Sequence, residues 1–248
     1  MKKNFNFLCA LPRTGATFLS SVINQSSQVK VSANSILPDV LMNLNETRQS
    51  SVFKNFPYHK GIDNIMLNSF EAYYKDIKVD SILDKAPWGT PYNLNMLKAV
   101  FKERKFIVLK RPVLECLASF VKIKKPENIE EYCEELMNKD VGILGKNIWS
   151  IKNLIDKKEK HIVITYDDLI NDCKKQIDRI FNFLKLKKEL INTDITRQYS
   201  FGNLGYADDI LDVPLHTIRV GKIKKIRYKV EKYLPNKIIK RYKDIETI

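Results

Sequence analysis

Three cationic side chains, Arg13, Lys85 and Arg111, each follow a short apolar run that is typical of a buried strand. In a parallel sheet the carboxyl ends of the strands meet at one edge, and ligands bind beyond that edge. Arginine can form paired hydrogen bonds with two oxygens of a phosphate or sulfate, whereas lysine acts as a compact positive charge. The spacing therefore predicts an anion-binding site built from these three residues at one edge of a sheet.

A loop of small residues, 12–17, separates the first apolar run from a segment with helical spacing of its apolar residues. The first N–H groups of a helix have no partner within the helix, and the helix dipole adds partial positive charge there. An ordinary strand-to-helix turn with a surface arginine is the alternative. No lysine follows the glycine, as a Walker A motif would require, so an NTPase is disfavoured. The residues predicted to bind a phosphate are Arg13, Thr14, Gly15, Ala16, Thr17 and Phe18.

The composition predicts a folded protein with anionic partners. Hydrophobic residues make up 44% of the 248 residues and charged residues 29%, which excludes global disorder. The formal net charge of +14 favours a nucleotide, a nucleic acid, an acidic glycan or a membrane surface as partner. Eleven of the cations lie between Arg219 and Lys243, where Glu231 is the only acid. Such a run is either a solvated face or a contact for an anionic acceptor or a membrane.

Cysteine and histidine positions indicate neither disulfides nor a metal centre. The four cysteines form no C-x-x-C pair, so we expect reduced, buried thiols, and the three histidines are scattered. No stretch approaches the roughly 18 apolar residues of a membrane helix, and the apolar run near the amino terminus is too short for a signal peptide. We therefore expect a cytoplasmic protein without a metal.

Strand-like and helix-like segments alternate along the chain, which predicts an α/β fold with a P-loop-like parallel sheet covered by helices on both faces. A single domain is expected over 1–248, with a core at about 5–186 and a basic C-terminal appendage at about 197–248. Segment 45–60 shows no clear period. Strands are expected at 5–11, 29–31, 79–83, 105–109 and 161–165, and helices at 18–24, 36–44, 62–74, 93–101, 113–121, 127–158 (one or two) and 167–186.

Several of these segments resemble the motifs of sulfotransferases that use 3′-phosphoadenosine 5′-phosphosulfate (PAPS). The sequence LPRTGATFL at 11–19 resembles the loop that binds the 5′-phosphosulfate, in the form of the tyrosylprotein and Golgi-type branch. Segment 105–120 resembles the motif for the 3′-phosphate, with Arg111 and Ser119 at the matching spacing of eight positions. DKAP at 84–87 resembles the segment that carries a catalytic lysine, here Lys85. ITYDDL at 164–169 places Tyr166 where the family has an aromatic residue near the adenine.

The resemblance has one departure, at the base that would deprotonate the acceptor. The tyrosylprotein branch carries a glutamate about twenty residues past the loop arginine, where this chain has Ala33, Asn34 and Ser35. We therefore expect the acceptor to be handled differently from that branch. Candidate bases are Asp39, Asp84 and His216, and the histidine is favoured by its near-neutral pKa. The late basic segment around His216 resembles the family's second contact to the 3′-phosphate, which implies Arg219 and Lys222 as ligands.

The resemblance thus implies an enzyme that moves a sulfonate group from PAPS to a hydroxyl or amine of a small molecule, glycan or protein. Lys85 would stabilise the charge that develops on the oxygen between sulfur and phosphorus, with Arg13 and His216 as the other catalytic residues. No metal and no specific nucleic acid are expected. The alternatives are a P-loop-type kinase and a non-enzymatic, basic nucleic-acid-binding protein.

Overall fold

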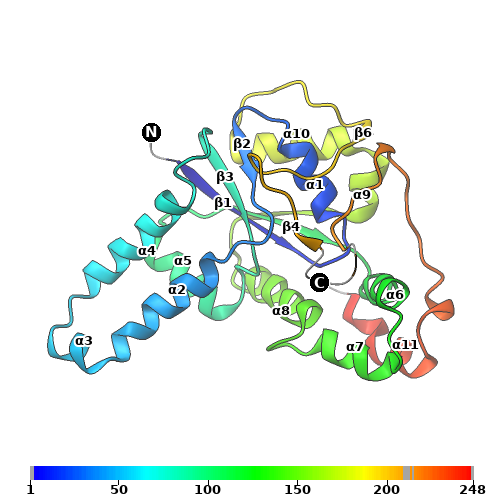
Figure 1. The fold of residues 1–248 in the computed structure, drawn as a ribbon, viewed down its shortest axis with the longest axis horizontal. Helices are drawn as coiled ribbons and strands as arrows, with labels where there is room; N and C mark the ends of the chain where they lie inside the picture. Colours follow the sequence, from blue (N-terminus) through cyan, green and yellow to red (C-terminus); the bar gives the residue numbers. More distant parts are fainter. Residues whose placement is uncertain (1–2, 209–212, 214, 247–248) are drawn as a thin grey trace.

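A five-stranded sheet in the order β2-β3-β1-β4-β5 forms the centre of the molecule, and every pair of neighbouring strands is parallel (Figure 1). The computed structural model describes residues 3–208, 213 and 215–246, and for Lys222 and Glu246 the backbone alone. β1 is the middle strand, so the loops that follow β1, β3 and β4 are neighbours. The predicted parallel sheet is confirmed, with β1 at Asn4–Ala10, β2 at Val29–Val31, β3 at Ser81–Lys85, β4 at Phe106–Lys110 and β5 at His161–Thr165.

Helices cover both faces of this sheet because successive side chains of each strand point to opposite faces. In β1, Phe5, Phe7 and Cys9 join one buried cluster, whereas Leu8 and Ala10 join the other. The larger cluster includes residues of α2, α4–α8 and α11, and the smaller one residues of α1, α9 and α10. The helices are α1 (Ala16–Ile23), α2 (Leu37–Glu46), α3 (Ser51–Asn55), α4 (His59–Tyr73), α5 (Pro91–Val100), α6 (Val113–Lys124), α7 (Ile129–Met137), α8 (Ile143–Asp156), α9 (Tyr166–Asn171), α10 (Cys173–Leu184) and α11 (Asn236–Tyr242).

Two segments differ from their sequence-based prediction. The single helix expected over 167–186 was wrong, because Asp172 leaves the helical conformation and its side chain accepts a hydrogen bond from the Lys175 N–H. An aspartate at this position caps a new helix instead of continuing the old one. Within 45–60, where no period was visible, the chain forms the short helix α3, and α2, α3 and α4 project together from the body (Figure 1).

The basic C-terminal segment packs against the core. β6 (Ile195–Thr196) pairs antiparallel with β7 (Gly221–Lys222), and α11 buries Ile238 and Tyr242 in the larger cluster. Its charges are partly neutralised within the protein, since Lys237 pairs with Glu130 at 2.5 Å and Arg241 pairs with Glu134, both acids on α7. The run of lysine and arginine is therefore only partly available to an external anion.

All four cysteines are free and buried, as expected from their spacing. Burial raises the pKa of the Cys9 and Cys116 thiols to about 12, so both remain protonated at neutral pH. In the described ranges, no helix has both the length and the apolar character needed to cross a bilayer.

Candidate active site

The loop after β1 presents the start of α1 to the edge of the sheet. Arg13 and Gly15 adopt left-handed backbone conformations, with φ of 67° and 81°. Gly15 is the N-cap of α1 and makes no side-chain capping bond, so the first N–H groups of the helix can bind an anion. Ala16 and Phe18 lie in this first turn. Thr14 is buried and its hydroxyl donates to the Leu11 carbonyl oxygen at 2.5 Å, so the hydroxyl holds the loop's shape.

Arg13, Arg111 and Ser119 meet beside this loop. The Arg13 Nε–H donates to Ser119 Oγ at 3.1 Å, and an Arg111 Nη1–H donates to the Arg13 carbonyl oxygen at 3.1 Å. A second N–H of Arg13 donates to the Leu215 carbonyl oxygen in the C-terminal segment. Burial lowers the pKa of Arg13, and the nearby charge of Arg111 acts in the same direction. Two of the three predicted cations are thus direct neighbours.

Arg111 is buried and bound to a carboxylate. Its Nη2–H donates to Glu115 Oε2 at 2.6 Å and to the Ile226 carbonyl oxygen at 2.6 Å, while its guanidinium lies 4.0 Å from the centre of the Tyr166 ring. Arg227 pairs with the other oxygen of Glu115 at 2.5 Å. A carboxylate and a phosphate offer an arginine similar oxygen acceptors, so Glu115 binds donors of Arg111 that also suit a phosphate oxygen.

Tyr166 joins this cluster to the loop. Its hydroxyl accepts a hydrogen bond from the Ile226 N–H at 2.9 Å, and its ring lies 3.5 Å from where a Cβ on Gly15 would be. Part of the C-terminal segment, residues 226–228, therefore lies against Arg111 and Ser119. The Ser119 hydroxyl donates to Tyr228 Oη at 3.2 Å.

Arg219 and Lys222, the two basic residues predicted from the late segment, precede the part of the C-terminal segment that lies against Arg111. Arg219 is exposed, and its carbonyl oxygen accepts a hydrogen bond from the Thr196 hydroxyl. Lys222 lies in β7, and its side chain is outside what the structure describes. The C-terminal segment contacts Arg111 through the Ile226 carbonyl oxygen, seven residues beyond Arg219, and through Tyr228, whose ring centre lies 5.3 Å from the guanidinium.

Lys85 ends β3, next to β1 in the sheet, with Leu8 as its register partner. Its Nζ donates to Asn34 Oδ1 at 3.0 Å and lies 3.4 Å from Tyr206 Oη. Removal from water lowers the pKa of Lys85 to about 8. The Thr17 side chain reaches the same tyrosine hydroxyl, so Tyr206 lies between Lys85 and the start of α1.

His216 stacks on Tyr206, with ring centres 3.8 Å apart and an angle of 1° between the planes. Its Nδ1 is 2.6 Å from Asp208 Oδ1, and its backbone N–H donates to Asp208 Oδ2 at 2.6 Å. With Nδ1 bound to the carboxylate, Nε2 is the nitrogen that can accept a proton from another group. Burial lowers the pKa of His216, the charges of Lys85 and Arg13 act in the same direction, and Asp208 opposes them.

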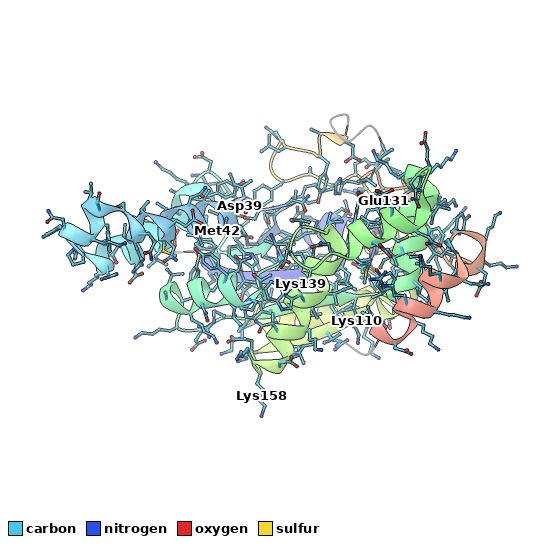
Figure 2. The ribbon with its side chains drawn as sticks, turned by 90° about the horizontal axis from the view of Figure 1, so that it is seen from below. Asp39, Met42, Lys110, Glu131, Lys139 and Lys158 are labelled. Carbon is cyan, nitrogen blue, oxygen red and sulfur yellow. The ribbon has the colours of Figure 1, made fainter. Side chains whose placement is uncertain are left out.

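The other two candidate bases are placed less favourably. Asp84 is fully buried and accepts hydrogen bonds from Ser35 Oγ and Trp88 Nε1, both at 2.8 Å, and from the Tyr74 hydroxyl. Burial raises the pKa of Asp84 to about 6, and its partners show that it holds the sheet edge together instead of reaching a substrate. Asp39 is exposed on α2, on the side of the projecting helices (Figure 2).

The structure thus brings Arg13, Lys85 and Arg111 to one edge of the sheet, around the start of α1. It also adds residues that the sequence did not single out: Glu115, Tyr206, Asp208 and Tyr228. Glu115 stands four positions after Arg111 on α6, a helical spacing that could have revealed the pair. Tyr206 and Asp208 lie in an irregular segment, where no periodicity marks them.

Comparison with known proteins identifies relatives of the fold. A family model described as the sulfotransferase family matches residues 7–189. A search of curated proteins finds no match. A solved mouse sulfotransferase complexed with PAP is 14% identical, covers 99% of this chain and 84% of its own, and gives a TM-score of 0.55. A sulfotransferase from Alicyclobacillus acidocaldarius is 10% identical over 78% and 85% of the two chains, also with a TM-score of 0.55. The sulfotransferase domain of the Synechococcus PCC 7002 olefin synthase is 19% identical over 85% and 84%, with a TM-score of 0.53. At these identities the likeness concerns the fold.

Proposed function

The chain belongs to the sulfotransferase family, and from this membership we propose that it moves a sulfonate group from PAPS to a hydroxyl or amine of an acceptor. One observation carries the proposal: Arg13, Lys85 and Arg111 lie at the carboxyl edge of one sheet, around an uncapped helix start. Cations at this edge suit an anion with several charged groups. The mouse relative's complex with PAP supports a donor that leaves as adenosine 3′,5′-bisphosphate.

The residues present fit such a donor. The N–H groups at the start of α1, with Arg13 and Thr17, would hold the 5′-phosphate and the sulfonate, while Arg111 and Ser119 would hold the 3′-phosphate and Tyr166 would face the adenine. Arg219 and Lys222 remain proposed contacts of the 3′-phosphate. The donor supplies the sulfonate group, and no metal ion is part of the proposal.

Arg111 can bind the 3′-phosphate only by giving up part of its present hydrogen bonds. Its side chain is 4% exposed, and Glu115 and the Ile226 carbonyl oxygen both accept from it. We therefore propose that the phosphate replaces Glu115 on Arg111, and that Glu115 keeps its contact with Arg227 on its other oxygen. Glu115 would then keep Arg111 oriented when the nucleotide is absent.

Lys85 and His216 take the two chemical roles in the proposal. Sulfuryl transfer, like phosphoryl transfer, depends on positioning the groups in line and stabilising charge on the leaving oxygen. The Lys85 ammonium would stabilise that oxygen, and Arg13 would help. His216, with Nδ1 held by Asp208, would take the acceptor's proton on Nε2. The chain then needs no glutamate at the position of Asn34.

A thermal shift experiment with adenosine 3′,5′-bisphosphate, ATP and AMP tests the donor. At 100 times its dissociation constant a ligand adds about 2.7 kcal/mol of stability. We expect stabilisation by the bisphosphate above that by AMP, and the loss of about half or more of it in Arg111→Ala. Incubation with ³⁵S-labelled PAPS and a panel of phenols, alcohols and amines then identifies the acceptor class.

Binding of other ligands distinguishes the proposed function from the two rival functions. A kinase would be stabilised by ATP with Mg²⁺ and not by the bisphosphate. A nucleic-acid-binding protein would bind DNA or RNA with a steep dependence on salt and show no bisphosphate shift. Either result would contradict the proposal.

A further inference from the structure

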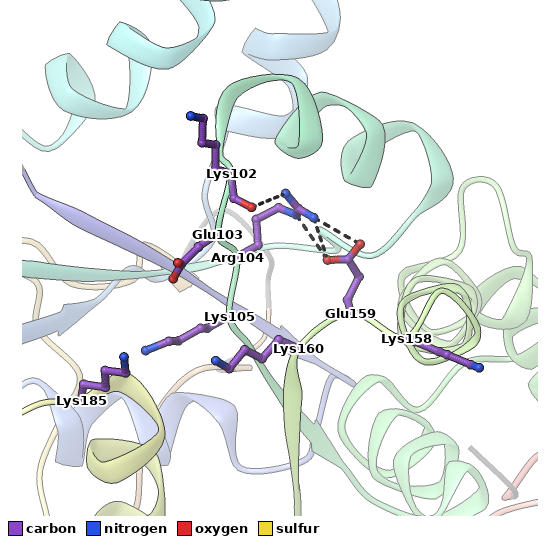
Figure 3. Close-up of a pocket in the computed structure, with 8 residues that line it drawn as sticks. All are labelled: Lys102, Glu103, Arg104, Lys105, Lys158, Glu159, Lys160 and Lys185. Atoms are coloured by element: carbon purple, nitrogen blue, oxygen red, sulfur yellow. Dashed lines mark hydrogen bonds and ion pairs between the residues drawn. The ribbon is translucent and has the colours of Figure 1, made fainter.

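A second cationic pocket lies at the opposite edge of the sheet, where β4 and β5 begin. The pocket has a volume of about 430 Å³, and six of its eight lining residues are lysine or arginine (Figure 3). Its lining comes from residues 102–105 before β4, residues 158–160 before β5, and Lys185 at the end of α10. β4 spans Phe106–Lys110. At about 3.3 Å per residue, Lys105 and Arg111 are about 20 Å apart along this strand, so the pocket is separate from the candidate active site.

Three lysines from three different elements point into the same space. Figure 3 shows the side chains of Lys105, Lys160 and Lys185 extending to the same side of β4 and β5. Burial lowers the pKa of Lys105, and the charges of Lys185 and Lys160 act in the same direction, so both ammonium groups repel that of Lys105. The Lys105 ammonium lies 5.9 Å from the centre of the Phe183 ring, so part of its stem is covered.

The acids of the pocket do not neutralise this trio. Glu159 accepts from Arg104 at 3.2 Å and lies 3.3 Å from Lys98, so its charge is balanced by those two residues. Glu103 acts on Lys105, but as a weaker influence on its pKa than Lys185 and Lys160. Lys158 points away from the trio, and it extends outward from the molecule in Figure 2 as well.

Ordinary helix chemistry accounts for only one of the three lysines. Lys185 is the C-cap of α10, where the helix carbonyls favour a cation, although its φ of 62° is unusual for a residue with a side chain. Lys105 and Lys160 stand before β4 and β5, five and four residues beyond the ends of α5 and α8, outside the last helical turns where the dipole acts. An anion beside Lys105 would offset the repulsion that Lys160 and Lys185 exert on its ammonium group.

We propose that Lys105, Lys160 and Lys185 form a second anion-binding site, which takes a small soluble molecule bearing phosphate or sulfate groups. Each ammonium group offers three donors and a compact charge, which suits oxygens of such groups. The volume falls within the range of small-molecule pockets. Three cations exceed the charge of one phosphate, so a ligand with two such groups fits best. The site does not depend on the nucleotide proposal.

Titration calorimetry with inorganic pyrophosphate tests this site. The full chain is first saturated with adenosine 3′,5′-bisphosphate so that the candidate active site is filled. We expect one pyrophosphate to bind per chain, with affinity that falls as the salt concentration rises. The double variant Lys105→Gln/Lys185→Gln should lose at least tenfold in affinity, and Lys160→Gln should lose less.

The matched control is Lys54→Gln/Lys60→Gln, which removes the same charge from exposed positions on the projecting helices. This control should bind pyrophosphate like the wild type. The absence of binding to the wild type, or an equal loss in the control, would overturn the proposal. Loss of pyrophosphate binding in Arg13→Ala would overturn it as well, since the anion would then occupy the loop after β1. Melting curves of all variants exclude misfolding as the cause.

Discussion

The two edges of the central sheet both gather positive charge, but they hold it differently. At the carboxyl edge, Arg13 and Arg111 are tied to Ser119, Glu115 and backbone carbonyl oxygens, so their donors have set directions. At the amino edge, Lys160 and Lys185 are exposed, and their charges repel the ammonium group of Lys105. The first arrangement suits selection of a ligand by geometry, and the second suits attraction of anions by charge.

This difference predicts that the carboxyl edge distinguishes between anions, whereas the amino edge attracts anions of many kinds. Directed donors distinguish one anion from another, because a misplaced oxygen leaves a buried donor unpaired. Clustered lysines on flexible stems adapt to many anions and lose strength as salt increases. Variants at the two edges should therefore have distinct effects on chemistry, affinity and stability.

Replacing Lys85 should have the largest effect. In Lys85→Met the leaving oxygen loses its ammonium group, and we expect the turnover rate of sulfonate transfer to fall about 10²- to 10³-fold. The measurement is the transfer of ³⁵S from labelled PAPS to the acceptor found in the panel. Lys160→Met, the matched change at the amino edge, should leave this rate unchanged, and equal losses in both variants would refute the distinction between the edges.

Removing the proposed base should come next. His216→Ala should lower the turnover rate about 10²-fold, because a positioned base typically contributes that much or more. In the wild type the rate should rise with pH through a pKa below 6.5, as His216 loses its proton, and fall through about 8, as Lys85 loses its own. The pH profile of His216→Ala should lack the acidic limb. A retained acidic limb would show that another group is the base.

A variant at Asp84 tests how much the hydrogen bonds at the carboxyl edge contribute to the free energy of unfolding. Asp84→Ala leaves the donors of Tyr74, Trp88 and Ser35 without their acceptor, the first two of them buried, and we expect a loss of about 2 kcal/mol in unfolding free energy. The wild type should lose stability as pH rises from 3.8 to about 6, because over this range the folded protein keeps a proton that the unfolded chain has released. Denaturant unfolding at several pH values measures both effects, and an unchanged slope in the variant would contradict the assignment to Asp84.

A variant at Arg111 tests whether the bisphosphate binds through directed hydrogen bonds or through positive charge in general. Arg111→Ala should weaken bisphosphate binding about 10- to 30-fold, or about 1.4–2 kcal/mol, which is the lower part of the range for hydrogen bonds to charged groups. Arg104→Ala, which removes an ion-paired arginine at the amino edge, should leave this affinity unchanged. Titration calorimetry with adenosine 3′,5′-bisphosphate gives both constants, and similar values for the two variants would argue for non-specific attraction.

The smallest expected effect belongs to Glu115. If the 3′-phosphate replaces this carboxylate on Arg111, Glu115→Gln removes a competing charge and should tighten bisphosphate binding about fivefold, equivalent to about 1 kcal/mol. Glu131→Gln, on the exposed side of α7, serves as the control for net charge. Weaker binding in Glu115→Gln would show that Glu115 supports the nucleotide site instead of competing for it.

The sequence predicted the parts of the fold and site that depend on local signals. The apolar runs before Arg13, Lys85 and Arg111 were enough to predict a parallel sheet and the meeting of these cations at one edge. Hydrogen bonds between distant segments could not be predicted from residue spacing. One example is the bond from Arg111 to the Ile226 carbonyl oxygen, which joins residues 115 positions apart. Asp172 and Tyr206 illustrate the two limits, since one is a capping residue within an apparently continuous helical pattern and the other lies in an irregular segment.

The bond between Arg13 and the Leu215 carbonyl oxygen joins residues 202 positions apart. A ribosome adding about 5–20 residues per second needs about 10–40 s to make the chain between them. During that interval the nascent loop after β1 already exists while His216, Ile226 and Tyr228 have not been synthesised. The nascent protein can therefore assemble its sheet before it can complete its candidate active site, and the proposed activity should be among the last properties it acquires.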